Sequence, residues 1–366
     1  MLCLIFIVLA FFQLSPAQAN PPGFDDIVLK AAAARDQNDI PQAIELYRRA
    51  EELKPDWPDG WWFLGSLQYS VDSYGPARDA LAHYLELVPD AGPAAALRGL
   101  CEYETGEYKE ALADIQRGLS LGAGNQSRNE KILRYHEALL LTRNANFEGA
   151  LQKYSPFAQE KVPNPELLVA VGLAGLRTPL LPKELNAEKQ DMYSAAGSAT
   201  LQYMSGDHEG ARQSFQDFFH RFPTAANAHY LYGYLLFPTD PDQATVEFKA
   251  ELEVSPSNPA AQLMVAWDAL LRNEPSEALT YAQKANAEQP GMPIAQLVLG
   301  RALLDTGNVK EGMELLEKEV QRDPNNLETH IALAKAYSKS GRKEDAHRER
   351  LRCLELEKNE VPVVHP

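Results

Sequence analysis

The chain has 366 residues, of which 45% are hydrophobic and 23% are charged, so it holds enough apolar side chains for a folded core. Its formal net charge of −16 at pH 7 and its isoelectric point near 5.0 argue against nucleic acid or an anionic membrane surface as the main partner. The chain is longer than one ordinary compact domain, yet no Gly/Ser-rich or charge-block linker divides it. A single elongated architecture is therefore expected.

The first nineteen residues, 1–19, carry an apolar run from Leu2 to Leu14 followed by Ala17-Gln18-Ala19. Such a run before a small-x-small cleavage pattern is typical of a secretory signal peptide, although no Lys or Arg precedes it. The run is too short to span a bilayer comfortably. The sequence therefore predicts an exported protein, periplasmic or secreted, without stable membrane insertion once the signal is cleaved. An uncleaved N-terminal anchor and a misassigned start codon are the alternatives.

Two cysteines, Cys101 and Cys353, would remain after signal cleavage, and no C-x-x-C pair occurs. This usage gives no support to a thioredoxin-like, haem-attachment or zinc-knuckle site. A lone cysteine in a helix is most often a buried thiol. We therefore expect two buried, free cysteines.

Small residues and prolines recur with the same period along the rest of the chain. Steps of 34 residues separate Ala43, Ala77 and Ala111, and again Ala244, Ala278, Gly312 and Ala346. Prolines give an independent ruler with steps of 33 or 34 residues at Pro223, Pro256, Pro290 and Pro324. Two residue types that share one period indicate a repeat protein.

Other positions fall into line on this ruler. The first clear set is Trp61, Leu64, Gly65, Tyr69, Ala77, Leu81 and Pro89, and a later set is Leu299, Gly300, Gly307, Gly312, Leu316 and Pro324. The pattern resembles the tetratricopeptide repeat (TPR) family over about residues 24–360. The resemblance implies an all-α fold, a right-handed α-solenoid (superhelix) of about nine to ten TPR units, each an antiparallel helix pair.

The expected repeat frames are 24–57, 58–91, 92–125, 131–164, 192–225, 225–258, 259–292, 293–326 and 327–360. Residues 165–191 start like a repeat and then break at TPLLPKELN. The expected organisation is a signal peptide (1–19), an N-terminal TPR block (20–164), an irregular seam or degenerate repeat (165–191), a C-terminal TPR block (192–360) and a tail (361–366).

Gly65 lies inside an expected first helix, where glycine costs about 1 kcal/mol relative to alanine. We expect it to face Ala77 on the second helix, so that the two backbones approach closely and cover Trp61 and Leu64. Consecutive helical residues point about 100° apart. Trp62 is therefore left for the surface.

No motif for catalysis or metal binding stands out. The eight histidines are scattered and form no H-E-x-x-H, and the chain holds no glycine-rich phosphate loop and no G-x-S-x-G elbow. The sequence therefore predicts no cofactor, no metal and no enzyme activity.

In TPR proteins the first helices of successive repeats line a groove that usually binds a segment of a partner. Carried over by frame, the resemblance implies a groove with these aromatic residues: Trp62, Tyr69, Tyr103, Tyr135, Tyr193, Tyr203, Tyr230, Tyr234 and Trp267. Aromatic side chains suit binding surfaces, but they also pack between repeats, so both roles are open for each residue except Trp62, for which ligand contact is preferred.

Some family members grip an acidic C-terminal peptide with a clamp of Lys, Asn and Arg. The corresponding positions here hold Asp25, Val28, Trp62, Ser66, Pro93 and Ala96, so no such clamp is expected. The leading prediction is a non-catalytic scaffold or adaptor that binds another exported protein, with no nucleic-acid partner. The alternatives are a glycan- or cell-wall-binding module and a regulatory subunit of an envelope enzyme complex.

Overall fold

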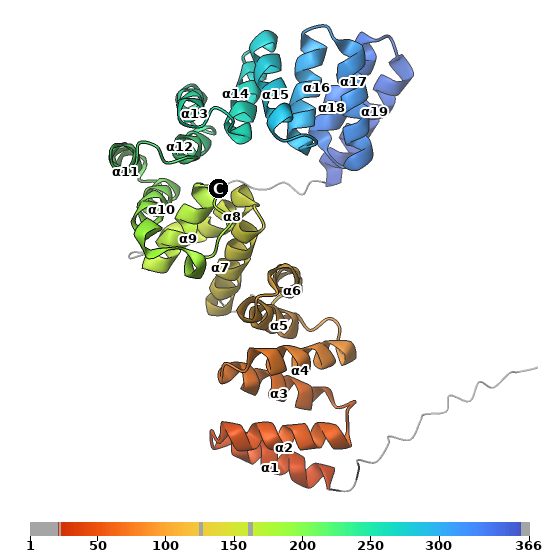
Figure 1. Cartoon of the computed structure of the whole chain (residues 1–366). Helices are drawn as coiled ribbons and strands as arrows, with labels where there is room; N and C mark the ends of the chain where they lie inside the picture. Colours follow the sequence, from red (N-terminus) through yellow and green to blue (C-terminus); the bar gives the residue numbers. More distant parts are fainter. Residues whose placement is uncertain (1–20, 22, 124–126, 160–163, 360–366) are drawn as a thin grey trace, which may run out of the picture. The chain divides into compact units, whose positions relative to one another are not determined.

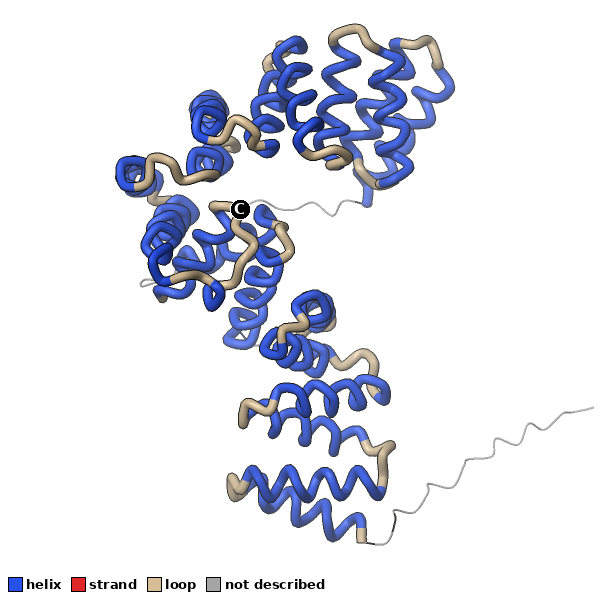
Figure 2. The backbone as a smooth tube through the Cα atoms, in the orientation of Figure 1, coloured by secondary structure: helices blue, strands red, loops and turns tan. Residues whose placement is uncertain are grey.

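The computed structural model describes residues 21, 23–123, 127–159 and 164–359, and within them the chain forms nineteen α-helices, three short 3-10 helices and no strand (Figures 1 and 2). The expected all-α solenoid of repeats is confirmed. The predicted signal peptide at 1–19 and the tail at 361–366 lie outside the described residues.

The chain divides into two compact units, and the division falls after Leu140, within α7 (Ser127–Arg143). This boundary lies before the end of the predicted N-terminal block at residue 164. The predicted seam, 165–191, belongs to the second unit.

Helix pairs build the first unit. Its helices are α1 (Phe24–Asp36), α2 (Ile40–Leu53), α3 (Pro58–Ser70), α4 (Tyr74–Leu87), α5 (Gly92–Thr105), α6 (Tyr108–Ser120) and the start of α7. Three of the predicted frames match pairs α1/α2, α3/α4 and α5/α6. α7 starts four residues before its predicted frame.

The second unit continues with α8 (Phe147–Tyr154), α9 (Pro165–Gly175), α10 (Gln190–Met204), α11 (His208–Arg221), α12 (Ala228–Leu236), α13 (Pro241–Val254), α14 (Pro259–Leu271), α15 (Pro275–Glu288), α16 (Pro293–Asp305), α17 (Val309–Arg322), α18 (Leu327–Lys339) and α19 (Lys343–Asn359). The five predicted frames from residue 192 onward correspond to the pairs α10/α11 through α18/α19.

Local sequence signals set the helix ends. Many helices begin with proline in the first turn, where its missing N–H is not needed. At α14 the Asn258 side chain also accepts hydrogen bonds of 3.1 Å from the backbone N–H groups of Ala260 and Ala261. Gly106 ends α5 with φ of 88°, a left-handed conformation that glycine adopts without strain.

Gly65 allows α3 and α4 to approach each other closely. A Cβ atom added at Gly65 would lie 2.7 Å from Leu81 Cγ and 3.4 Å from the Ala77 carbonyl oxygen, so the predicted contact with the second helix is confirmed. The equivalent glycines of later pairs, Gly99, Gly233 and Gly300, meet their second helices in the same way.

The prediction for Trp61 was wrong in part. Leu64 is buried, but Trp61 is only half-buried. The Trp61 ring packs on His83, with centroids 4.6 Å apart, and its Nε1 donates to the Pro55 carbonyl at 2.8 Å. Trp61 therefore covers the edge of the helix pair instead of filling its core.

The predicted seam contains a regular helix, α9, which packs tightly on α10. A Cβ at Gly172 would lie 1.9 Å from the Tyr193 carbonyl oxygen, and one at Gly197 would lie 1.9 Å from the Leu168 carbonyl oxygen. The irregular part follows α9, where Leu181 is fully buried and its N–H donates to Glu184 Oε2 at 2.8 Å. α9 is thus an additional helix against the predicted α10/α11 pair.

Cys101 and Cys353 are buried and form no disulfide, as predicted. Burial raises the pKa of the Cys101 thiol to about 12, with a smaller contribution from the Glu102 carboxylate. This thiol is therefore not a reactive nucleophile at neutral pH.

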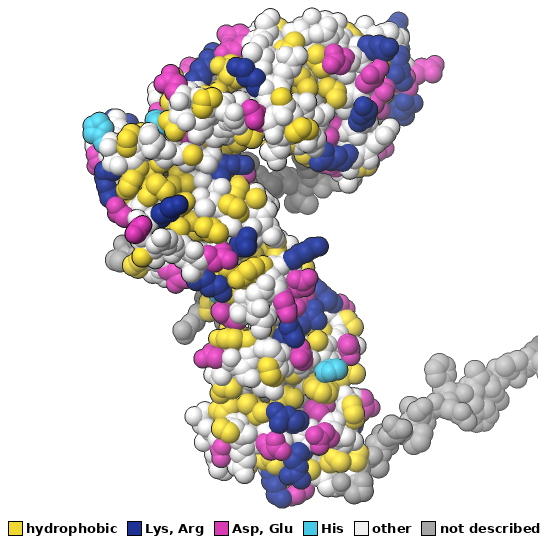
Figure 3. All heavy atoms as spheres, viewed as in Figure 1, with side chains coloured by type: hydrophobic (Ala, Val, Ile, Leu, Met, Phe, Trp, Pro, Cys, Tyr) yellow, Lys and Arg dark blue, Asp and Glu magenta, His cyan; other side chains and the backbone are white. Residues whose placement is uncertain are grey.

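Charged side chains of both signs crowd over the last helices, α17 to α19, on the face drawn in Figure 3.

No helix in the described part of the chain is long and apolar enough to cross a membrane.

Glu51, near the end of α2, is a buried carboxyl group. Its side chain is 3% exposed, and neither oxygen has a hydrogen-bond partner among the described residues. The backbone of α3 comes so close that a Cβ at Gly60 would lie 1.8 Å from Glu51 Oε1. Burial, with a smaller effect of the Asp56 carboxylate, raises the pKa of Glu51 to about 8.

Replacing Gly172 by alanine should destabilise the second unit by roughly 2 kcal/mol or more, because the new methyl group collides with backbone that cannot move aside. Gly75→Ala is the matched control, since a Cβ there meets nothing within 4 Å. Thermal melting followed by circular dichroism measures both. Equal melting temperatures for the two variants would contradict the close packing of α9 on α10.

The raised pKa of Glu51 predicts that stability falls as pH rises. Between the unfolded value of 4.5 and the folded value of about 8, the folded chain binds the proton more tightly than the unfolded chain. Glu51→Gln should flatten this slope and raise the free energy of unfolding at pH 8 by about 1–3 kcal/mol.

Urea unfolding at pH 5 and pH 8 tests this expectation. Tryptophan fluorescence is a suitable signal, because Trp61 and Trp62 lie on α3, whose backbone approaches Glu51, and Trp57 directly precedes that helix. Glu102, whose pKa burial raises to about 7, adds to the slope in both proteins and cancels in their difference. An unchanged pH slope in the variant would refute the assignment to Glu51.

Candidate functional site

The first unit holds an apolar groove of about 500 Å³ between its first helices α3, α5 and α7. Its lining residues, which we call the groove residues, are Trp62, Tyr69, Pro93, Ala96, Leu97, Leu100, Gly122, Ala123, Asn129, Ile132 and Leu133. All of them belong to the same compact unit. The groove lies where the repeat pattern predicts a partner-binding surface.

The groove is hollow because small residues stand where another repeat has a large one. Ala96 occupies the position 34 residues after Trp62, so α5 has a methyl group where α3 has an indole ring. The backbone of α6 comes up behind Ala96, and a Cβ at Gly118 would lie 2.7 Å from the Ala96 nitrogen. The floor is therefore tightly closed, and the space above it remains open.

Aromatic side chains form one wall of the groove. The Trp62 ring lies 5.8 Å from the ring of Tyr84, and Tyr69 meets Tyr74 edge to face at 5.6 Å. Both partners come from α4, the second helix of the same pair. The wall is thus positioned by the packing of its own repeat, as a preformed binding surface requires.

The chemistry of the groove is largely apolar. Among its described lining residues none is charged, and only Trp62, Tyr69 and Asn129 carry polar side-chain atoms. Ile132 is 42% exposed, so much of its aliphatic side chain is open to solvent. Burial raises the pKa of Tyr69, and the Cys101 thiol and the carboxylates of Glu104 and Asp72 add to that rise.

Two other predicted groove aromatics of the first unit, Tyr103 and Tyr135, lie around His136. Tyr103 is buried and its ring is 4.9 Å from the imidazole, while the half-buried Tyr135 is 5.6 Å from it. Neither belongs to the groove lining.

In the second unit Tyr230 and Tyr234 stack on each other, with ring centroids 6.3 Å apart. The Tyr230 hydroxyl donates to Glu148 Oε1 at 3.0 Å. The Arg177 guanidinium lies 4.9 Å from the centre of the Phe147 ring and 5.1 Å from the centre of the Tyr230 ring. It also pairs with the Glu148 carboxylate. Burial and the Glu148 carboxylate raise the pKa of Tyr230. This cluster joins α8, the segment directly after α9, and α12.

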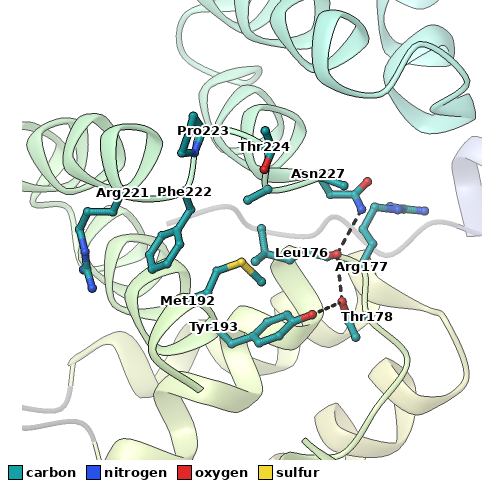
Figure 4. Close-up of a pocket in the computed structure, with 12 residues that line it drawn as sticks. Leu176, Arg177, Thr178, Met192, Tyr193, Arg221, Phe222, Pro223, Thr224 and Asn227 are labelled. Carbon is teal, nitrogen blue, oxygen red and sulfur yellow. Dashed lines mark hydrogen bonds between the residues drawn. The ribbon is translucent and has the colours of Figure 1, made fainter. Parts of the chain in front are cut away.

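Tyr193 lies beside a smaller pocket of about 440 Å³ (Figure 4). Its hydroxyl is hydrogen-bonded to the Thr178 hydroxyl at 3.0 Å, and Asn227 Nδ2 donates to the Leu176 carbonyl at 3.2 Å, so these polar atoms hold the end of α9 (Figure 4). The lining of this pocket includes Arg177, Thr178, Arg221 and Asn227, so it is more polar than the groove of the first unit.

The last two predicted aromatics also have partners within the second unit. The Tyr203 hydroxyl is 3.0 Å from the Thr239 hydroxyl, and Trp267 is half-buried with the Arg301 guanidinium 4.9 Å above its ring. Of the nine predicted residues, the structure brings Trp62 and Tyr69 together in one apolar groove. A ligand-binding role for any of the nine stays a prediction.

Aliphatic groove residues were missed by the sequence reasoning. Leu97, Leu100, Ile132 and Leu133 were not singled out, because apolar residues of a repeat helix serve the core in most positions. The signal that could have found them is the 34-residue comparison of Trp62 with Ala96.

In the described chain no three His, Cys, Asp or Glu side chains gather to hold a metal ion.

Comparison with known proteins supports the repeat assignment. Models of the tetratricopeptide repeat match residues 28–74 and 269–318. The TPR repeat-containing protein MJ1428 of Methanocaldococcus jannaschii is 28% identical over 127 residues, which is 32% of this chain and 22% of that protein. The human protein O-mannosyl-transferase TMTC1 is 37% identical over 62 residues, 17% of this chain.

The chain spans only 7% of TMTC1 and 22% of MJ1428. A solved structure of YrrB, a TPR protein with an unusual peptide-binding site, is 18% identical and superposes with a TM-score of 0.41, covering 49% of this chain and 92% of that chain. The helix pairs, their 34-residue period and the two matched segments agree, so residues 28–74 and 269–318 of this chain are similar to tetratricopeptide repeats.

Proposed function

We propose that the protein is a non-catalytic interaction scaffold that holds a segment of a partner protein in the groove between α3, α5 and α7. The observation that carries this proposal is an apolar groove of about 500 Å³ with a closed floor and an aromatic wall. TPR proteins generally mediate protein–protein interaction, and a preformed apolar groove on their first helices is a suitable surface for it.

The lining favours a protein segment over a glycan. A sugar needs several hydrogen-bonding groups beside its stacking face, whereas this groove has polar side-chain atoms only on Trp62, Tyr69 and Asn129 among its described residues. Apolar side chains of a partner would gain about 25 cal/mol for each Å² that they bury there. The partner in this proposal is another exported protein, since residues 1–19 have the pattern of a secretory signal.

Ile132→Glu places a charge in the groove and should weaken peptide binding at least about tenfold, because the carboxylate must lose its water when a ligand enters. Leu87→Glu is the matched control, since Leu87 is 40% exposed against 42% for Ile132 and is not a groove residue. Peptides selected from a random library on residues 20–366 serve as ligands, and fluorescence anisotropy measures their affinity.

Circular dichroism should show both variants folded, and Leu87→Glu should keep the affinity of the wild type within twofold. If the selected peptides bind Ile132→Glu as well as the wild type, the groove is not the site. If soluble cell-wall oligosaccharides compete with the peptides for the groove, the glycan-binding alternative replaces the proposal.

A further inference from the structure

We infer that the groove residues receive an amphipathic α-helix of the partner, and that this helix presents a basic side chain next to Tyr69. The inference rests on the proposed function and specifies the partner's chemistry. It combines the shortage of polar atoms along the groove with the acidic side chains at one end of it.

The shortage of polar atoms favours a helix over an extended segment. An extended peptide brings one N–H and one C=O per residue into the groove, and each must find a partner once water has left. Asn129, Tyr69 and Trp62 cannot match such a row of backbone groups. A helix satisfies its backbone internally and offers only side chains, which suits an apolar floor such as Ala96, Leu97 and Leu100.

The Tyr69 end of the groove is acidic. Asp72 follows α3 directly, is exposed, and accepts a hydrogen bond of 2.6 Å from the Tyr74 hydroxyl. Burial is the main cause of the raised pKa of Tyr69, and the hydrogen bond to Asp72 is the main cause of the raised pKa of Tyr74. The negative charge of Glu104, which is exposed on α5, adds to both rises. The Asp72 carboxylate, which is hydrogen-bonded to Tyr74, and the Glu104 carboxylate on α5 therefore give this end of the groove negative charge.

One cation near this end, Arg78, is already paired with carboxylates. The positive charge of Arg78, on α4, partly offsets the rise in the pKa of the Cys101 thiol. The Arg78 guanidinium pairs with Asp79 at 2.7 Å and also with Glu107. The chain as a whole carries a net charge of −16. A Lys or Arg of the partner at this end would find opposite charge, and a Glu or Asp would be repelled.

Synthetic amphipathic peptides of about sixteen residues test the inference. All carry Leu at i, i+3, i+4 and i+7, one with Lys at both ends, one with Glu at both ends, and a third Lys-ended peptide with Pro in the middle to break the helix. Their affinity for residues 20–366 is measured by fluorescence anisotropy. The chain variants are Glu104→Lys and, as control for the change in net charge, Glu110→Lys on α6.

The Lys-ended helix should bind at least fivefold more tightly than the Glu-ended helix at low salt, with a smaller ratio at high salt. Glu104→Lys should abolish or reverse this preference, and Glu110→Lys should keep it. The peptide with Pro should bind at least tenfold more weakly than its parent.

Equal affinity for the Lys- and Glu-ended peptides, or equal effects of Glu104→Lys and Glu110→Lys, would overturn the basic partner. Tight binding of the Pro peptide would overturn the helix. Either result leaves the proposed function intact as long as Ile132→Glu still blocks binding. Binding of every peptide equally by Ile132→Glu and wild type would instead remove the groove itself.

Discussion

The closeness with which two helices can approach controls most of this structure. In four of the pairs a glycine of the first helix faces the second helix closely, and Gly65 opposite Ala77 and Leu81 is the clearest case. Glycine in a helix is unfavourable by itself, but the approach brings large side chains such as Leu64 and Leu81 under cover. The free energy from that burial offsets the loss, and the 34-residue period follows from repeating the contact.

The same physical rule produces the candidate site. Where α3 carries Trp62, α5 carries Ala96, and Gly118 lets α6 close the space behind it. The result is a groove with a rigid floor instead of a filled interface. An open apolar groove therefore arises here because a large side chain is missing, while the backbone geometry of the pair is kept.

The fold was predictable from the sequence because the period is carried by residues whose role is steric. Pro, Gly and Ala mark helix starts, turns and close contacts, and these constraints act locally within each repeat. The first turn of α7 was not predicted, because residues 127–130 lie between two frames. Residues 165–191 were predicted to start like a repeat, but the packing of α9 on α10 was not predicted, because the segment that follows α9 breaks the period. α9 is stabilised by Gly172 and Gly197, whose contacts join helices on either side of an irregular loop.

The site was less predictable than the fold. A frame places an aromatic residue on a helix face, but it does not say whether a neighbouring ring or carboxylate covers that residue. Tyr230 has the frame position of a groove residue, yet Glu148, which hydrogen-bonds to it, comes from 82 residues earlier. Trp62 remains at an open surface because of what is absent at Ala96, and an absence is visible only when repeats are compared side by side.

The cluster of Glu148, Arg177 and Tyr230 has a consequence for how the second unit comes apart. Stacked repeats that touch only their neighbours can fray from either end, one pair at a time. Here a carboxylate on α8, a guanidinium after α9 and a phenol on α12 are bound to one another, so none of these elements can leave without breaking the contacts of the other two. The N-terminal part of this unit, from α8 to α12, should consequently open and close as one cooperative block, with gradual fraying confined to the helix pairs that follow it.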